Sequence, residues 1–212
     1  MFSGVDEAGR GSVMGPLVVA AVYAESDGLL REIGVKDSKR LTPKVRESMF
    51  DRISESFITK VVMLSASEID SRRERLTLNE IELEMFLDVS ASNGVARIFA
   101  DCPDVNEAHF KGAMEAKLEG IEVISKHRAD DTYPIVSAAS IIAKVTRDRV
   151  MEDIAAEFDK DVGSGYPSDE VTMGFIEKWL NDNGAPPPHT RNSWKPVRTM
   201  MSLSKNTKIT DW

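Results

Sequence analysis

Residues 4–22 read GVDEAGRGSVMGPLVVAAV and set how the fold begins. A short apolar strand ends in two adjacent acids, Asp6 and Glu7, and the chain then turns through Gly-Arg-Gly at 9–11. Successive side chains of a strand point to opposite faces, so these acids cannot both reach one point by side-chain direction alone. Glycines tolerate positive φ and have no Cβ, so the turn lets backbone and ligand approach closely. This combination suits a metal ion and a phosphate.

Apolar patterns along the rest of the chain predict alternating strands and helices. Strands are expected at about 2–7, 16–24, 58–64, a segment ending at Asp101, and 122–125. Helical periodicity favours helices at about 43–56, 67–74, 77–92, 107–117 and 168–181, and a long helix starting at Pro134. Thr77 and Glu80 have the spacing of a capping box. The order predicts an α/β fold with a mixed five-stranded sheet flanked by helices. We expect a core over 1–160, a small helical subdomain over 161–203 and a tail over 204–212.

The composition fits a folded domain of moderate size. With 212 residues, 42% of them hydrophobic, the chain can bury one core and a small appendage. It has no apolar run of about 18 residues, and its N-terminus lacks the features of a signal peptide. The single cysteine, Cys102, excludes an internal disulfide and fits a reducing compartment. We therefore expect a cytoplasmic protein with no membrane span. We also expect a monomer.

The charge distribution is uneven. A net charge of −8 argues against a uniformly basic surface that coats nucleic acid. Basic residues are nevertheless concentrated in 35–47 (VKDSKRLTPKVRE) and 189–198 (HTRNSWKPVR). Either run alone is typical of a solvated surface. Their occurrence beside a carboxylate site favours contact with nucleic acid.

Four acids stand out by position. Asp6 and Glu7 end the first strand, Asp101 ends the strand RIFA, and Asp130 precedes the long helix. Such positions can converge on one edge of an α/β sheet. Singly, each could be a helix cap or a surface acid, and either Asp130 or Asp131 could stabilise the N-terminal end of the next helix. Clustered carboxylates repel unless divalent cations neutralise them, and oxygen ligands favour Mg²⁺ or Mn²⁺.

Four segments carry a family resemblance when taken together and in order. They are GVDEAGRGSVMGPLVVAAV at 4–22, VKDSKRLTP at 35–43, RADDTYPIVSAASIIAKVTRD at 128–148 and GSGYPSD at 163–169. With these segments the chain resembles type 2 ribonuclease H (ribonuclease HII) of the archaeal kind. Arg128 stands where the family usually has lysine, which keeps the charge. The resemblance implies a ribonuclease-H-like fold.

The resemblance also implies site residues. The catalytic, metal-binding acids are Asp6, Glu7, Asp101 and Asp130, which would hold two Mg²⁺ or Mn²⁺ ions. Asp130 is preferred to Asp131 because the family pattern is basic–Ala–Asp, two residues, then Tyr-Pro. The substrate-binding residues are Gly9, Arg10, Gly11, Lys39, Arg40, Thr42, Ser140, Lys144, Arg147 and Tyr166.

Some of these substrate contacts have a specific expected role. The backbone of the Gly-Arg-Gly turn would read the 2′-hydroxyl, the group that distinguishes RNA from DNA at one position. Tyr166 would pack on the deoxyribose that follows, although it could equally anchor the C-terminal helix. The remaining residues are expected to contact phosphates, which position the duplex without reading its sequence. Ser140 could instead ease close helix packing.

The function implied by the resemblance is hydrolysis of RNA in RNA–DNA hybrids. The enzyme would cut on the 5′ side of a ribonucleotide, including a single one embedded in DNA, and leave a 3′-hydroxyl and a 5′-phosphate. This activity serves primer removal in DNA replication and ribonucleotide excision repair. The alternatives are a type 3 ribonuclease H, another nuclease of the same fold, and an inactive hybrid-binding module.

The last residues, NTKITDW at 206–212, suggest a partner. The spacing resembles the peptide Gln-x-x-aliphatic-x-x-aromatic through which replication proteins bind a sliding clamp. Ile209 and Trp212 would be its apolar anchors, and Asn206 stands where glutamine is usual. This departure, and the single terminal aromatic, predict weak binding. The tail could otherwise pack on its own domain.

Overall fold

A mixed five-stranded sheet forms the centre of the larger part of the chain. The computed structural model describes residues 1–35, 41–90 and 94–207. The strands are β1 (Phe2–Ala8), β2 (Leu17–Ala24), β3 (Ile58–Leu64), β4 (Arg97–Asp101) and β5 (Glu122–Lys126), in the sheet order β3-β2-β1-β4-β5. β1 pairs antiparallel with β2 and parallel with β4, and β4 pairs parallel with β5. The predicted mixed α/β sheet is confirmed.

Helices connect and flank the strands. They are α1 (Gly28–Ile33), α2 (Pro43–Ser56), α3 (Ala66–Arg72), α4 (Leu78–Ser90), α5 (Glu107–Glu115), α6 (Ala129–Thr132), α7 (Pro134–Phe158), α8 (Glu170–Asn183) and α9 (Lys195–Thr207). The capping box predicted at α4 is present, because Thr77 N–H donates to Glu80 Oε2 at 2.7 Å and Glu80 N–H donates to Thr77 Oγ1 at 3.3 Å. The sequence patterns do not predict α1, α6 or α9. The first two are too short for a helical period to emerge. In the described part of the chain, no helix has the length and apolarity needed to cross a membrane.

The chain divides into two compact units, which we call the sheet unit and the C-terminal unit. The sheet unit comprises Met1–Ala8, Val18–Met63 and Thr77–Thr146, and the C-terminal unit comprises Gly9–Leu17, Leu64–Leu76 and Arg147–Trp212. This division differs from the boundaries expected at 160 and 203. Two early segments join the C-terminal unit, and α9 runs through Thr207.

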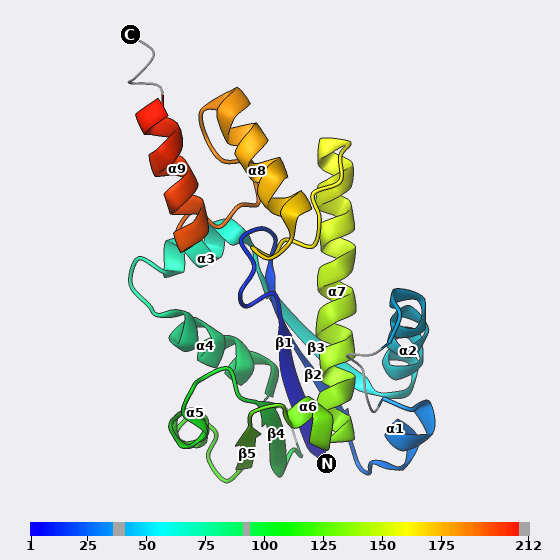
Figure 1. The fold of residues 1–212 in the computed structure, drawn as a ribbon. Coiled ribbons are helices and arrows are strands. Elements are labelled where there is room, and N and C mark those ends of the chain that lie inside the picture. The colour runs from blue at the N-terminus through cyan, green and yellow to red at the C-terminus, as the bar shows by residue number, and fades with distance from the viewer. Residues whose placement is uncertain (36–40, 91–93, 208–212) are drawn as a thin grey trace. The chain divides into compact units, whose positions relative to one another are not determined.

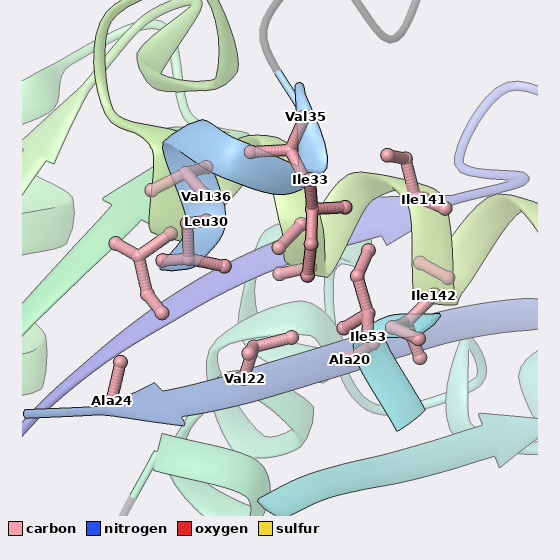
Figure 2. Packing of buried hydrophobic residues seen from close by; sticks show 14 of the residues in the cluster. Ala20, Val22, Ala24, Leu30, Ile33, Val35, Ile53, Val136, Ile141 and Ile142 are labelled. Carbon is pink, nitrogen blue, oxygen red and sulfur yellow. The ribbon is translucent and has the colours of Figure 1, made fainter. Parts of the chain in front are cut away.

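One face of the sheet packs against α1, α2 and α7. Every residue of β2 is buried, and alternate residues along it belong to one apolar cluster with α1, α2 and the first half of α7. Figure 2 shows Ala20, Val22 and Ala24 of β2 beside side chains of these helices. Gly4 of β1 meets α7 so closely that a Cβ there would lie 2.4 Å from the Ile135 backbone. Even-numbered residues of β1 therefore face α7.

Helices α4 and α5 cover the opposite face of the sheet. Figure 1 shows them on the side of the strands away from α7, and α4 packs against β1 while α5 packs against β5. Tyr23, on the second face of β2, donates its hydroxyl to the Val89 carbonyl of α4. Since both faces are covered, β2 (LVVAAVYA) is buried along its whole length and carries no charged residue, as a strand with helices on both sides requires.

The C-terminal unit has its own apolar core. Val13 and Met14 from the early segment pack with the second half of α7, α8 and α9 through Met151, Ile176 and Val197. The segment that starts at Gly9, two residues after Glu7, therefore contributes Val13 and Met14 to a different apolar core from the one beside β1 and β2.

Candidate functional site

Asp6 and Asp101 lie side by side at one edge of the sheet unit. β1 and β4 are parallel, with Val5 opposite Ala100, so the next residues along each strand are also neighbours. Asp6 shares the α7 face with Gly4, and Asp101 shares it with Phe99, which packs against the same cluster. The expected meeting of strand-end acids therefore occurs for these two.

The environment of Asp6 disfavours its charge. The side chain is 4% exposed. Burial raises the pKa of Asp6 well above its usual 3.8, and repulsion from the carboxylates of Glu7 and Asp101 raises it further. A hydrogen bond from the Ser140 side chain and one from the Glu7 backbone N–H, at 2.7 Å, act in the opposite direction. Ser140, predicted to contact phosphate, thus supports the ionised form of Asp6.

Asp130 is linked to Asp101 through the backbone. Asp101 Oδ1 accepts a hydrogen bond from Ala129 N–H at 2.8 Å, which fixes the start of α6 beside the end of β4. Asp130 follows directly and is 5% exposed. Asp131 is exposed and forms an ion pair with Arg128 at 2.7 Å. This contrast supports the preference for Asp130, although its role as a metal ligand stays a prediction.

The acidic residues have the oxygen ligands that a divalent cation prefers, but their side chains are not arranged as a complete metal site. Within residues 1–35, 41–90 and 94–207, no three His, Cys, Asp or Glu side chains are close enough to form a ready metal site. Asp6 nevertheless bears the combined repulsion of Glu7 and Asp101 while buried. A hard divalent ion relieves such repulsion, and carboxylate oxygens are its preferred ligands. By their chemistry, these carboxylates fit a hard divalent cation such as Mg²⁺ or Mn²⁺.

The Gly-Arg-Gly turn belongs to a tightly connected loop in the C-terminal unit. Gly9 has φ +91°, and a Cβ there would lie 2.4 Å from the Pro16 carbonyl oxygen and 2.5 Å from Arg147 Nε. Ser12 closes the turn by donating its hydroxyl to the Gly9 carbonyl at 2.8 Å. Gly11 is exposed, and a Cβ there would meet nothing within 4 Å. The two glycines therefore have different structural reasons for being glycine.

Tyr166 contacts this loop through its hydroxyl. The Gly9 N–H donates to Tyr166 Oη at 3.1 Å, and the ring lies on the Arg147 guanidinium at 4.7 Å. Neighbouring Gly165 accepts from Val13 N–H at 2.8 Å and from Met14 N–H at 3.1 Å. Tyr166 is thus in direct contact with the Gly-Arg-Gly turn, which the sequence did not predict. Its stacking on a deoxyribose stays a prediction.

Arg147 does not have the predicted position of a phosphate contact. Its side chain is 2% exposed, and Nη2 donates to the Met14 carbonyl at 3.3 Å and the Ser164 carbonyl at 2.9 Å. Burial lowers the pKa of its guanidinium. Arg147 lies on the side of α7 that faces the loop, where carbonyl oxygens and Tyr166 enclose it, and this position does not favour the predicted phosphate contact.

The other predicted contacts fall into two groups. Thr42 caps α2 by accepting from Val45 N–H at 3.4 Å, and Lys144 is half-buried on α7. Arg10 is half-buried in the loop, and Asn206 lies in the last turn of α9. Lys39, Arg40, Ile209 and Trp212 lie outside the described residues. Their predicted roles stay predictions.

The sequence reasoning missed Arg191. It lies in the basic run 189–198, which is typical of a surface, yet its side chain is 0% exposed. Its Nε donates to the Gly15 carbonyl and its Nη1 to the Arg10 carbonyl, each at 3.1 Å. The only signal in the sequence is the aromatic Trp194 within the run, on whose ring the guanidinium lies at 4.9 Å.

Comparison with known proteins gives consistent matches. Residues 3–197 match the family model of ribonuclease HII. Ribonuclease HII of Methanoregula boonei is 39% identical over 213 residues, which is 100% of either chain. A chain in the PCNA:ribonuclease HII complex from Archaeoglobus fulgidus is 38% identical with a TM-score of 0.88, over 94% of this chain and 96% of that one. Ribonuclease H2 of Pyrococcus horikoshii is 39% identical with a TM-score of 0.88, and the match covers 96% of this chain and 98% of that one. Bst ribonuclease HIII in complex with Mn²⁺ shares the fold with a TM-score of 0.80 at 20% identity. The match covers 96% of this chain and 70% of that one.

Proposed function

We propose that this chain, which belongs to the ribonuclease HII family of endonucleases that hydrolyse RNA in RNA–DNA hybrids, cuts on the 5′ side of ribonucleotides, including single ones embedded in DNA. The products are a 3′-hydroxyl and a 5′-phosphate. The observation that carries the proposal is the pairing of Asp6 and Asp101 on one face at the ends of parallel strands, with Asp130 tied to Asp101 through Ala129.

The acids supply the catalytic half of this proposal. Asp6, Glu7, Asp101 and Asp130 would hold two divalent cations, Mg²⁺ or Mn²⁺. Cations held there would supply Lewis-acid chemistry, an activated water and charge stabilisation at the leaving oxygen. A hydrogen bond from the Ser140 side chain favours the ionised form of Asp6, the form that binds a cation, and so opposes the effect of burial on its pKa. No covalent enzyme intermediate is needed.

The loop supplies the recognition half. Gly9 is held from inside by Tyr166 and Ser12, and Gly11 presents an exposed backbone with no side chain. Such a backbone can reach a 2′-hydroxyl, which both donates and accepts hydrogen bonds. Tyr166, whose hydroxyl oxygen accepts a hydrogen bond from the Gly9 N–H, offers its half-buried ring to the neighbouring sugar. The proposed preference is therefore a ribonucleotide followed by DNA.

A cleavage assay tests the proposed function directly. With Mg²⁺ or Mn²⁺, a duplex carrying one embedded ribonucleotide is expected to be cut at one position, 5′ of that nucleotide. The same duplex made wholly of DNA should stay intact, because the loop has no 2′-hydroxyl to bind. Gel mapping of the product ends checks the position and the 5′-phosphate. Binding without cleavage would instead support an inactive hybrid-binding module.

A sliding clamp is the proposed protein partner. The structural relative from Archaeoglobus fulgidus was solved in a complex with PCNA. In this chain the proposed contact is the segment NTKITDW at 206–212, whose first two residues are the last two of α9. Apolar anchors three residues apart, Ile209 and Trp212, would fill a hydrophobic pocket on the clamp.

Variants of this segment should change clamp affinity in opposite directions. Ile209→Ala combined with Trp212→Ala is expected to weaken binding at least about 100-fold, because two buried anchors are lost. Asn206→Gln should strengthen it, because glutamine is usual at that position of the peptide. Isothermal titration with an archaeal clamp measures all three proteins, and cleavage of a short duplex without clamp serves as the control. Unchanged affinity in the double variant would show that the tail is not the contact.

A further inference from the structure

The C-terminal unit contains two buried arginines that form no ion pair with any described residue. Arg147 is 2% exposed and Arg191 is 0% exposed. Burying an unpaired charge costs free energy, which hydrogen bonds offset only in part. Burial lowers the pKa of Arg191 and the positive charge of Arg147 lowers it further, while Tyr166 and the carboxylate of Asp70 act in the opposite direction. Because two buried guanidiniums in one unit are costly, we expect Arg147 and Arg191 to have a role other than filling space in the core.

The acceptors of these guanidiniums are concentrated in one loop. Arg191 binds the carbonyls of Arg10 and Gly15, both at 3.1 Å, and so spans the loop from near its start to its end. Arg147 binds the Met14 carbonyl at 3.3 Å from the same interior. Because the guanidinium is planar with its donors in a fixed fork, Arg191 sets the separation of two carbonyls. Lysine has no such fork.

The contact with Arg10 also sets the direction of a backbone donor. In a trans peptide the C=O and the following N–H point to opposite sides, and the bond between Arg10 and Gly11 is trans. The Arg10 carbonyl points inward to Arg191. The N–H of Gly11 therefore points outward, at an exposed residue without a side chain.

We infer that Arg191 is a positioning residue for ribose specificity: by holding the Arg10 carbonyl inward, it aims the Gly11 N–H at the 2′-hydroxyl oxygen of the substrate. This inference rests on the proposed function, in which the turn reads that hydroxyl. It assigns no chemistry to Arg191 itself. Arg191 acts only through the peptide that it orients.

The loop does not depend on this side chain for its path. The Arg191 backbone N–H donates to the Val13 carbonyl at 2.8 Å, and Gly15 N–H donates to the His189 carbonyl at 2.9 Å. The carboxylate of Asp70 holds the next residues through Asn192 N–H at 2.7 Å and Ser193 N–H at 3.1 Å. Variants at Arg191 therefore keep the backbone pairing while losing the fork.

Binding measurements separate orientation of the turn from general stability. The Asp6→Asn background with Mg²⁺ keeps the substrate intact, and fluorescence anisotropy compares two duplexes that differ by one 2′-hydroxyl. We expect the ratio of the two dissociation constants to fall about tenfold in Arg191→Met, the scale of one lost hydrogen bond. Arg191→Lys, which keeps the charge and much of the stem, should show a similar fall.

A matched core variant is the control. Val197→Ala removes methyl groups from a fully buried position of the same apolar core. It should lower Tm but leave the binding ratio unchanged. An unchanged ratio in the Arg191 variants overturns the inference, and so does an equal fall in Val197→Ala at a matched loss of Tm. If the parent loop shows no preference for the ribonucleotide duplex, the proposed function itself fails.

Discussion

Replacing Asp6 by Asn is expected to abolish turnover while leaving the fold intact. The amide is neutral and a poorer ligand for a hard cation, so the cluster loses the charge that holds the ions. We expect single-turnover cleavage of a duplex with one ribonucleotide to slow by roughly 10³-fold or more, as when a group acting directly on the reacting charge is removed. Quench-flow or gel time courses at saturating enzyme measure this rate.

The same substitution should not destabilise the metal-free protein. The native state keeps a proton on Asp6 at pH values where the unfolded chain has lost it, because its pKa is raised from 3.8. Stability contributed by this group therefore falls as pH rises from 3.8 to the raised value, and the whole penalty remains above that value. Asp6→Asn removes the penalty. With a chelator at neutral pH, thermal unfolding should show a Tm equal to or above that of the unsubstituted protein.

Asp131→Asn is the matched control for this prediction. Asp131 neighbours Asp130 in the chain, but its carboxylate is exposed and pairs with Arg128 at the surface. Loss of such a surface pair changes stability by about 1 kcal/mol or less. Cleavage should stay within a few-fold of the parent rate. Retained cleavage in Asp6→Asn, or a comparable loss in Asp131→Asn, would contradict the assignment of the acids.

The neighbouring positions of Asp6 and Asp101 were predictable because strand ends are visible in a sequence. An apolar run that stops at an acid predicts both a strand and an acidic side chain near the strand's C-terminal end, as at Asp6 and Asp101. The parallel register of β1 with β4 then places the two residues side by side. The capping box before α4 was equally local, since Thr77 and Glu80 are only three residues apart.

The parts that escaped prediction depend on pairing between distant segments. Arg147 and Arg191 look like surface cations in the sequence, because most arginines in polar runs are solvated. Their burial follows from the pairing of Met14 with Thr190 and from hydrogen bonds such as that from Arg191 to Gly15, 176 residues apart. No periodicity encodes such a contact. The division between the units is unpredictable for the same reason, since residues 9–17 join a core built mainly from the C-terminal third.

Substitution by alanine should lower the stability of the protein at Gly9 but not at Gly11. Gly9→Ala is expected to destabilise the protein by roughly 2–3 kcal/mol, because the residue has positive φ and its Cβ would collide with a backbone oxygen and a buried side chain. The collisions are with the Pro16 carbonyl oxygen at 2.4 Å and with Arg147 Nε at 2.5 Å. Chemical denaturation of the full chain measures the loss. Activity should fall with it, since the same loop carries the turn.

Gly11→Ala should leave stability almost unchanged and still impair catalysis. Its Cβ would meet nothing within 4 Å and its φ lies outside the left-handed region, so the folded chain has room for it. We expect a stability change within about 0.5 kcal/mol. If the turn reads the ribose, the added methyl group stands where the sugar must approach, and displacement of the substrate should slow cleavage by about 10²-fold. Cleavage at the parent rate in a fully folded Gly11→Ala protein would mean that the turn does not contact the sugar. Because Gly9→Ala disturbs the fold and Gly11→Ala does not, the pair separates a glycine required by the protein from one required by its substrate.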